Sequence, residues 1–365
     1  MVENFTSGPP ADSSLVRDGR IPSLDGIRAL AIGMVVLSHL SGAPGFVTLP
    51  GETADWLGET GVRTFFVLSG FLITTLLLAE YAKNGEVSLL RFYIRRCFRI
   101  FPAFYLYLLV LAGLSAFGWI LLLPGDLAKA ALYVVDYCPW DSTSNFVRHI
   151  WSLSVEEQFY LVWPVAIWAL GIRRAKWIAV ISIIASPFWR IAVISFFPVA
   201  TETLFRRFDC LTDALATGCL LACIGTSLSE SARYRAILRS RWMHLLPVIV
   251  LAAAATSGHP HLYLFVSDSV MHLGIALYMH RAILYPPRFL NLLVLRQIGL
   301  MSYSVYLWQQ LFCSGQEGLV RWPWFLALPL TAAASAISYY GVELPFQQWG
   351  RRLTKQVLAK SLAPV

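Results

Sequence analysis

The chain has 365 residues, of which 57% are hydrophobic and only 14% are charged, and its formal net charge is +8. Soluble domains have roughly 45–50% apolar residues, so this composition excludes an ordinary soluble enzyme and indicates a membrane protein. A net positive charge alone would also suit a nucleic-acid-binding protein, but the placement of the basic residues explains it differently.

Apolar runs of nearly 20 residues recur along the whole chain, and about 20 helical residues are needed to cross the hydrocarbon core of a bilayer. We therefore predict an all-α polytopic membrane protein with about ten transmembrane helices. The expected spans are 24–41, 62–81, 100–123, 152–170, 177–197, 208–228, 243–258, 262–280, 298–316 and 323–342.

The regions outside these spans are short. The first 22 residues are polar and lack the apolar run of a signal peptide, so we expect a flexible cytosolic tail. The transmembrane domain is expected over residues 23–345, followed by a basic cytosolic tail over 346–365. Residues 126–138 are apolar enough to form a re-entrant or interfacial helix within the outer segment 124–150.

The basic residues indicate the orientation of the chain. With the N-terminus inside, 21 of the 29 Lys and Arg residues fall in inner segments and only five in outer segments. Cytoplasmic loops carry such an excess of positive charge. We therefore place both termini in the cytosol and expect no nucleic-acid partner.

The six cysteines form no CxxC pair and show no metal-ligand spacing with histidines. Most lie in apolar helices, where a cysteine behaves as a small hydrophobic residue. We predict no metal site and no redox role for them.

The first expected span, in PSLDGIRALAIGMVVLSHL, contains Arg28 and His39. Eleven residues separate them, so they share one helical face and lie about 16 Å apart along the axis. Asp25, three residues before Arg28, can pair with it. By itself, His39 is better explained as a core histidine bonded to a neighbouring carbonyl group.

Two further arginine-containing stretches follow. In GVRTFFVLSGFLIT, the pair Ser69-Gly70 indicates close helix approach, and Arg63 either reaches outward to the interface or has a function within the membrane. In RFYIRRCFRIFP, arginines repeat every four residues and form a stripe that suits phosphate groups or simple anchoring at the inner face. This stripe comprises Arg91, Arg95 and Arg99, with Arg96 adjacent.

The stretch WSLSVEEQFYLVWP places two carboxylates, Glu156 and Glu157, near the outer start of the fourth span. Carboxylates in a membrane are costly and indicate function, although both residues could also lie just outside the hydrocarbon. The topology puts them at the depth of His39, and Ser152 adds a hydroxyl there. A histidine held by a carboxylate is a usual general-base arrangement, so we predict that His39 and Glu156 form a pair.

The C-terminal stretches IGLMSYSVYLWQQLF and GVELPFQQWGRR are also polar for membrane helices. The first carries hydroxyl groups, including that of Tyr303. In the second, Glu343 can pair with Arg351 or other inner arginines. Ordinary helix contacts and capping explain these residues well.

Taken together, these motifs resemble the acyltransferase-3 family of membrane O-acyltransferases, in the family's order and over nearly the whole chain. The resemblance implies transfer of an acyl group, often acetyl, from cytosolic acyl-CoA to a hydroxyl of a saccharide, glycolipid or small acceptor. Acyl-CoA is then a substrate, and no bound cofactor is expected. The resemblance also implies a bacterial inner membrane and, without an appended outer hydrolase-like domain, direct transfer from the membrane site.

The family's pattern assigns roles to individual positions. Its first-helix signature falls on Arg28 and His39, its helix-four carboxylate on Glu156, and its CoA-phosphate face on the basic run. Gln309 stands where many relatives have a histidine, and we do not count it as catalytic. The expected site comprises catalytic His39, Glu156 and Arg28; acyl-CoA-binding Arg91, Arg95, Arg96, Arg99 and Ser69; and supporting Asp25, Arg63, Glu157, Ser152 and Tyr303.

Two mechanisms remain open from the sequence. His39 either deprotonates the acceptor hydroxyl or attacks the thioester itself and forms an acyl-imidazole. A different class of function is a transporter or exporter that uses the same intramembrane charges as a substrate or proton path. Release of free thiol from acyl-CoA distinguishes the enzyme from the transporter.

Overall fold

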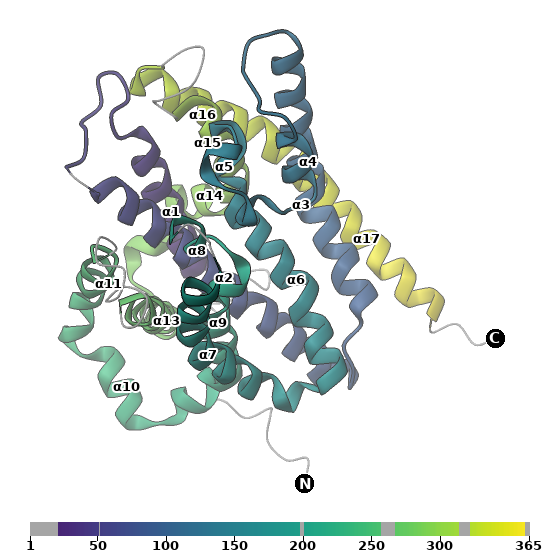
Figure 1. Ribbon diagram of the computed structural model, residues 1–365. Coiled ribbons are helices and arrows are strands. Elements are labelled where there is room, and N and C mark those ends of the chain that lie inside the picture. Colours follow the sequence, from purple (N-terminus) through teal and green to yellow (C-terminus); the bar gives the residue numbers. More distant parts are fainter. Residues whose placement is uncertain (1–20, 51, 198–200, 257–266, 314–321, 362–365) are drawn as a thin grey trace.

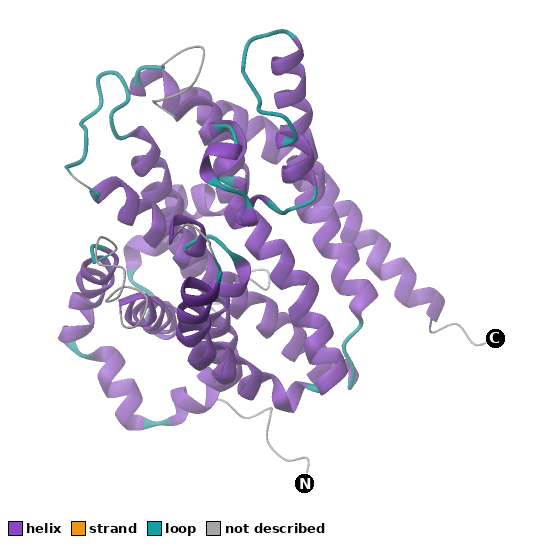
Figure 2. Ribbon diagram, viewed as in Figure 1, coloured by secondary structure: helices purple, strands orange, loops and turns teal. Residues whose placement is uncertain are grey.

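The computed structural model describes residues 21–50, 52–197, 201–256, 267–313 and 322–361. Over these ranges the chain folds into helices joined by loops and turns, without a β-strand (Figures 1 and 2). This confirms the predicted all-α class. The predicted N-terminal tail falls almost entirely outside the described residues.

Six described helical segments are long and apolar enough to cross a membrane: Pro22–Leu40, Thr53–Asn84, Leu89–Ala116, Ile172–Phe196, Thr212–Glu230 and Trp324–Thr354. The segments Ala232–Arg239 and Arg241–Ala254 meet at an angle of 53° and make a seventh if they form one broken span.

Each of the ten ranges predicted as spans nevertheless contains helix. The longer helices are α1 (Pro22–Leu40), α2 (Thr53–Asn84), α3 (Leu89–Ala116), α6 (Ile150–Leu170), α7 (Ala175–Phe196), α9 (Thr212–Glu230), α13 (Asp268–Leu284), α16 (Trp324–Ser338) and α17 (Leu344–Ser361). The shorter ones are α4 (Asp126–Ala131), α5 (Asn145–Arg148), α8 (Thr201–Leu204), α10 (Ala232–Arg239), α11 (Leu246–Ala254), α14 (Leu293–Leu300) and α15 (Ser302–Cys313). At 17 and 12 residues, α13 and α15 are shorter than the roughly 20 residues that a full crossing needs.

Glycines bring α2 and α9 into backbone contact. A Cβ atom on Gly70 would lie 1.9 Å from the carbonyl oxygen of Leu215, and one on Gly218 would lie 2.0 Å from that of Val67. No larger residue fits at either position, so the two helices are held in one register. This is the close approach that Ser69-Gly70 predicts, and it fixes the rotation of α2 between its neighbours.

The segment between α3 and α6 folds into the short helices α4 and α5 and the single turns η1 (Val135–Tyr137) and η2 (Trp140–Ser142). The Asp126 carboxylate accepts hydrogen bonds from the backbone N–H groups of Leu123 and Ser144 at 2.9 and 3.1 Å. The Tyr107 hydroxyl of α3 donates to the carbonyl of Phe146 at 2.8 Å. The first two bonds hold the segment together, and the third ties it to α3 (Figure 1).

Helices α16 and α17 are continuous through the π-helical turn η8 (Tyr339–Glu343). Helix α17 runs beside α3 (Figure 1), where the ring centroids of Phe98 and Trp349 are 5.0 Å apart. Part of the predicted C-terminal tail is therefore helix packed on the domain.

Candidate active site

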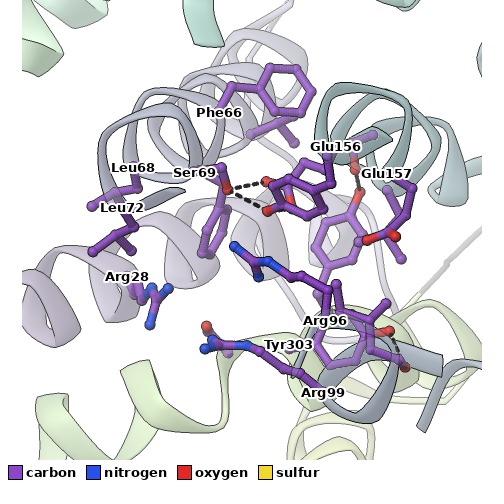
Figure 3. A pocket seen from close by; sticks show the side chains of 18 residues that line it. Arg28, Phe66, Leu68, Ser69, Leu72, Arg96, Arg99, Glu156, Glu157 and Tyr303 are labelled. Atoms are coloured by element: carbon purple, nitrogen blue, oxygen red, sulfur yellow. Dashed lines mark hydrogen bonds between the residues drawn. The ribbon is translucent and has the colours of Figure 1, made fainter. Parts of the chain in front are cut away.

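A cavity that is partly open to the outside lies among α1, α2, α3, α6 and α15, and its space, including the open part, is about 800 Å³. Figure 3 shows its polar side chains converging from several helices. The lining residues are Arg28, Val62, Phe65, Phe66, Leu68, Ser69, Leu72, Arg96, Arg99, Ile100, Ser152, Leu153, Glu156, Glu157, Tyr160, Ser302, Tyr303 and Tyr306.

Three guanidinium groups form one part of this cavity. Arg96 and Arg99 are three residues apart on α3 and therefore share a face, while Arg28 reaches in from α1 (Figure 3). Arg28 Nη1 lies 3.7 Å from Asp25 Oδ1, as the sequence predicts. The guanidinium of Arg96 lies 4.1 Å from the ring centroid of Tyr160, which orients it by a cation–π contact. Such a cluster can bind phosphate groups bidentately.

Glu156 is held by hydroxyl groups. The Ser69 hydroxyl donates to Oε1 of Glu156 at 2.8 Å, and the Tyr160 hydroxyl lies 3.1 Å from Oε2 and 3.0 Å from Ser69 Oγ. Tyr160 follows Glu156 by four residues, so one face of α6 supplies both groups. Ser69 comes from α2, and this cluster therefore joins two helices across the cavity.

A second group of hydroxyls lines the cavity nearer the start of α6. The Ser152 and Tyr306 hydroxyl oxygens are 2.5 Å apart, and the Tyr306 hydroxyl donates to the carbonyl of His149 at 2.7 Å. The Tyr303 hydroxyl donates to the carbonyl of Ile100 at 2.9 Å. Helix α15 is thereby attached to both α3 and α6.

His39 lies beside this end of the cavity without lining it. Its Nδ1 atom is 2.7 Å from Oε1 of Gln309, which is fully buried and follows Tyr306 by three residues. An amide oxygen only accepts hydrogen bonds, so Nδ1 carries the proton and Nε2 keeps a free electron pair. A partly exposed imidazole in this tautomer is suited to accept a proton.

The structure does not form the predicted pair of His39 and Glu156. Both oxygens of Glu156 bind Ser69 and Tyr160, and the imidazole binds Gln309 instead. The prediction was based on equal depth, but depth along a helix does not specify which way each helix is rotated. Gln309, which we did not count as catalytic, is the actual partner of His39.

The four arginines of the basic run separate into two pairs. Arg96 and Arg99 line the cavity, whereas Arg91 and Arg95 lie 3.3 and 3.4 Å from the carboxylate of Glu80 on α2. Arg91 lies five residues, about one and a half turns, before Arg96, whereas Arg95 is next to Arg96 in the sequence and points about 100° away from it around α3. Of the four arginines predicted to bind phosphate, two therefore face the cavity and the other two pair with Glu80.

Arg63 neither reaches outward nor lines the cavity, and it is completely buried. It contacts Glu59 at 2.7 Å and Asp268 at 3.7 Å. Asp268 also lies 2.9 Å from Nη2 of Arg190, which contacts Asp213.

His272 completes this buried group, with Nδ1 3.6 Å from Asp213 and Nε2 3.2 Å from Asp268. We call Arg63, Arg190, Asp213, Asp268 and His272 the buried ion cluster. Its His and Asp side chains are close enough together to ligate a metal ion. The guanidinium of Arg190 already contacts both carboxylates and would have to be displaced by such an ion.

Several residues of the site were missed in the sequence. Tyr160 could have been found, because it follows Glu156 by four residues within the same motif. The positions of Tyr306 and Ser302 in the cavity, and the bond between Gln309 and His39, depend on how α15 packs against α1 and α6. The spacing of residues along the chain does not predict this packing.

The family profile described as an acyltransferase domain matches residues 21–342. Among curated proteins, the chain is 29% identical over 374 residues to the peptidoglycan O-acetyltransferase OatA of Listeria monocytogenes, covering 90% of this chain and 56% of that protein. It is 28% identical to the O-acetyltransferase OatA of Staphylococcus aureus, covering 90% of this chain and 58% of that protein. The chain thus spans less than two thirds of the length of these relatives. No solved structure matches.

Proposed function

Because the chain belongs to the acyltransferase-3 family of integral membrane proteins, we propose that it is an acyl-CoA-dependent O-acyltransferase acting on a saccharide. The observation that carries the proposal is one cavity that joins three guanidinium groups to buried hydroxyls, next to the His39–Gln309 pair. The names of the relatives favour acetyl as the transferred group and a peptidoglycan-like polymer as the acceptor, with glycolipids and small hydroxylated molecules as further candidates.

We also propose ten spans with both termini in the cytosol of a bacterial inner membrane. The helices in all ten predicted ranges and the excess of inner positive charge support this topology. The transmembrane domain then covers 23–345, and the three cavity arginines face the side from which cytosolic acyl-CoA arrives. The phosphates bind Arg28, Arg96 and Arg99, and the thioester arm extends toward Ser152 and Tyr306.

In the proposed reaction, His39 acts as the general base. Its Nε2 atom takes the proton of the acceptor hydroxyl, whose oxygen attacks the thioester carbonyl and forms a tetrahedral intermediate. Collapse of the intermediate forms the ester and expels the CoA thiolate, which receives the proton back from His39. Gln309 fixes the tautomer, a role that elsewhere is often filled by a carboxylate. Glu156 keeps α2 and α6 in place beside the donor.

The test measures thiol release from acetyl-CoA by purified protein in detergent with a panel of saccharide acceptors. Acceptor-dependent release is expected for the wild type. His39→Ala should lower kcat by about 10²–10⁴-fold with an unchanged KM for acetyl-CoA, which is the usual contribution of a positioned base. Gln309→Leu should lower kcat less, because the base remains but its tautomer is no longer held.

Three outcomes would contradict the proposal. Release that survives in His39→Ala would exclude this base. A hydroxylamine-sensitive acyl group trapped on His39 would replace general-base catalysis by an acyl-imidazole route. A wild type that releases no thiol with any acceptor or acyl chain would favour the transporter over the enzyme.

A further inference from the structure

Adjacent carboxylates of α6 have different surroundings. Residues next to each other in a helix point about 100° apart, so Glu156 and Glu157 face different groups. Both oxygens of Glu156 are engaged by Ser69 and Tyr160. Glu156 is therefore satisfied by the protein alone and is best explained as a residue that positions α2 against α6.

Glu157 lines the same cavity but makes no hydrogen bond or ion pair with any residue that the structure describes. Figure 3 shows it on the side of α6 away from Ser69. A carboxylate in a membrane interior needs hydrogen-bond donors, because it has lost those of water. Glu157 thus receives no hydrogen bond from the described residues, and it faces the space where substrate is expected.

The position of Glu157 within the cavity indicates which part of a substrate it meets. The arginines occupy one part of the cavity, and Ser152 and Tyr306 lie near His39. Glu157 follows Ser152 by five residues, about 7.5 Å along α6. We expect a group that extends from the arginines toward His39 to pass Glu157, because Glu157 lines the same cavity. Phosphates are repelled by a carboxylate, whereas neutral N–H groups are attracted.

We propose that Glu157 binds the amide N–H groups in the arm of acyl-CoA, between the phosphates and the thioester. This inference rests on the proposed function and deepens it, since it divides donor recognition between arginines for the phosphates and one carboxylate for the neutral arm. It also changes the roles expected for the two carboxylates: Glu157, expected only to support the site, contacts the donor, and Glu156, expected to be catalytic, positions helices.

The test compares two ligands by calorimetry on the purified full chain in detergent. The first is CoA, and the second is phosphoadenosine diphosphate, which is the nucleotide part of CoA without its arm. Glu157→Leu should weaken CoA binding by about 10- to 100-fold, the range for a hydrogen bond to a charged group, and leave nucleotide binding unchanged. Glu157→Gln keeps an acceptor oxygen and should lose less. Glu86→Leu, the same change at an exposed position, should alter neither.

The outcomes separate this inference from the function on which it rests. Equal weakening of both ligands, or of neither, by Glu157→Leu would overturn it, as would a lowered kcat with unchanged CoA affinity. An increase in KM for the saccharide alone would move Glu157 to the acceptor. Failure of wild-type protein to bind either ligand would instead contradict the use of acyl-CoA itself.

Discussion

Two charged regions take residues from different faces of α2, and they are built differently. Ser69, on one face of α2, lines the cavity together with three arginines. Arg63, on another face, belongs to the buried ion cluster and contacts carboxylates. Charges that the protein neutralises itself stabilise the packing of helices. Charges that face a cavity retain their attraction for a ligand. Burial alone therefore does not identify an arginine that binds a ligand. What distinguishes it is whether carboxylates of the protein already neutralise its charge.

The largest expected effect is on the stability of the buried ion cluster. Arg190→Leu removes the guanidinium that contacts both Asp213 and Asp268, and breaking a buried pair from one side costs about 3–5 kcal/mol of folding free energy. Thermal unfolding in detergent should show a large loss for this variant. Arg207→Leu, at a partly exposed pair with Asp209, is the matched control and should cost about 1 kcal/mol or less. Similar losses in both variants would mean that the cluster contributes no special stability.

The next effect concerns donor affinity and uses two pairs of arginines on one helix. Arg96→Ala and Arg99→Ala should each raise the KM for acetyl-CoA by about 10- to 100-fold, because each removes hydrogen bonds to a phosphate. Arg91→Ala and Arg95→Ala remove only contacts with Glu80 and should change KM by less than about fivefold. Steady-state kinetics on all four variants test the division. Similar increases in KM for all four variants would mean that the whole basic run binds the phosphates.

The last effect is spread over several pH units: it is a pH dependence at a buried carboxylate whose hydrogen-bond partners are neutral. Asp136 accepts hydrogen bonds from Gln158 Nε2 at 3.0 Å and from the Phe208 N–H at 3.3 Å, and burial raises its pKa from 3.8 to about 7. Between these values the unfolded chain is ionised while the folded protein keeps the proton. Stability should therefore fall as pH rises from about 4 to 7, by at most about 1.4 kcal/mol per unit, and then level off.

Thermal unfolding of wild type and Asp136→Asn at several pH values measures this contribution. The amide does not ionise, so the variant should lose the part of the pH dependence that Asp136 supplies. Identical pH profiles for the two proteins would show that Asp136 is already ionised in the fold at low pH.

The outcome for individual residues shows which predictions a sequence supports. Asp25 and Arg28 are three residues apart on one helix, and they pair as expected. His39 and Glu156 lie on different helices, and their expected pair does not form. Contacts within a helix follow from its fixed geometry, whereas contacts between helices also depend on how each is rotated and shifted.

By itself, the sequence determined the helical membrane class, the family and most of the polar residues that reach the cavity. Hydropathy and helical spacing carry that information because they act locally along the chain. Only the tertiary structure decided that Gln309 holds His39, that Ser69 and Tyr160 hold Glu156, and that Glu157 is left facing the cavity. Those pairings depend on helix rotation, which is set by close contacts such as Gly70 against Leu215, far apart in the chain.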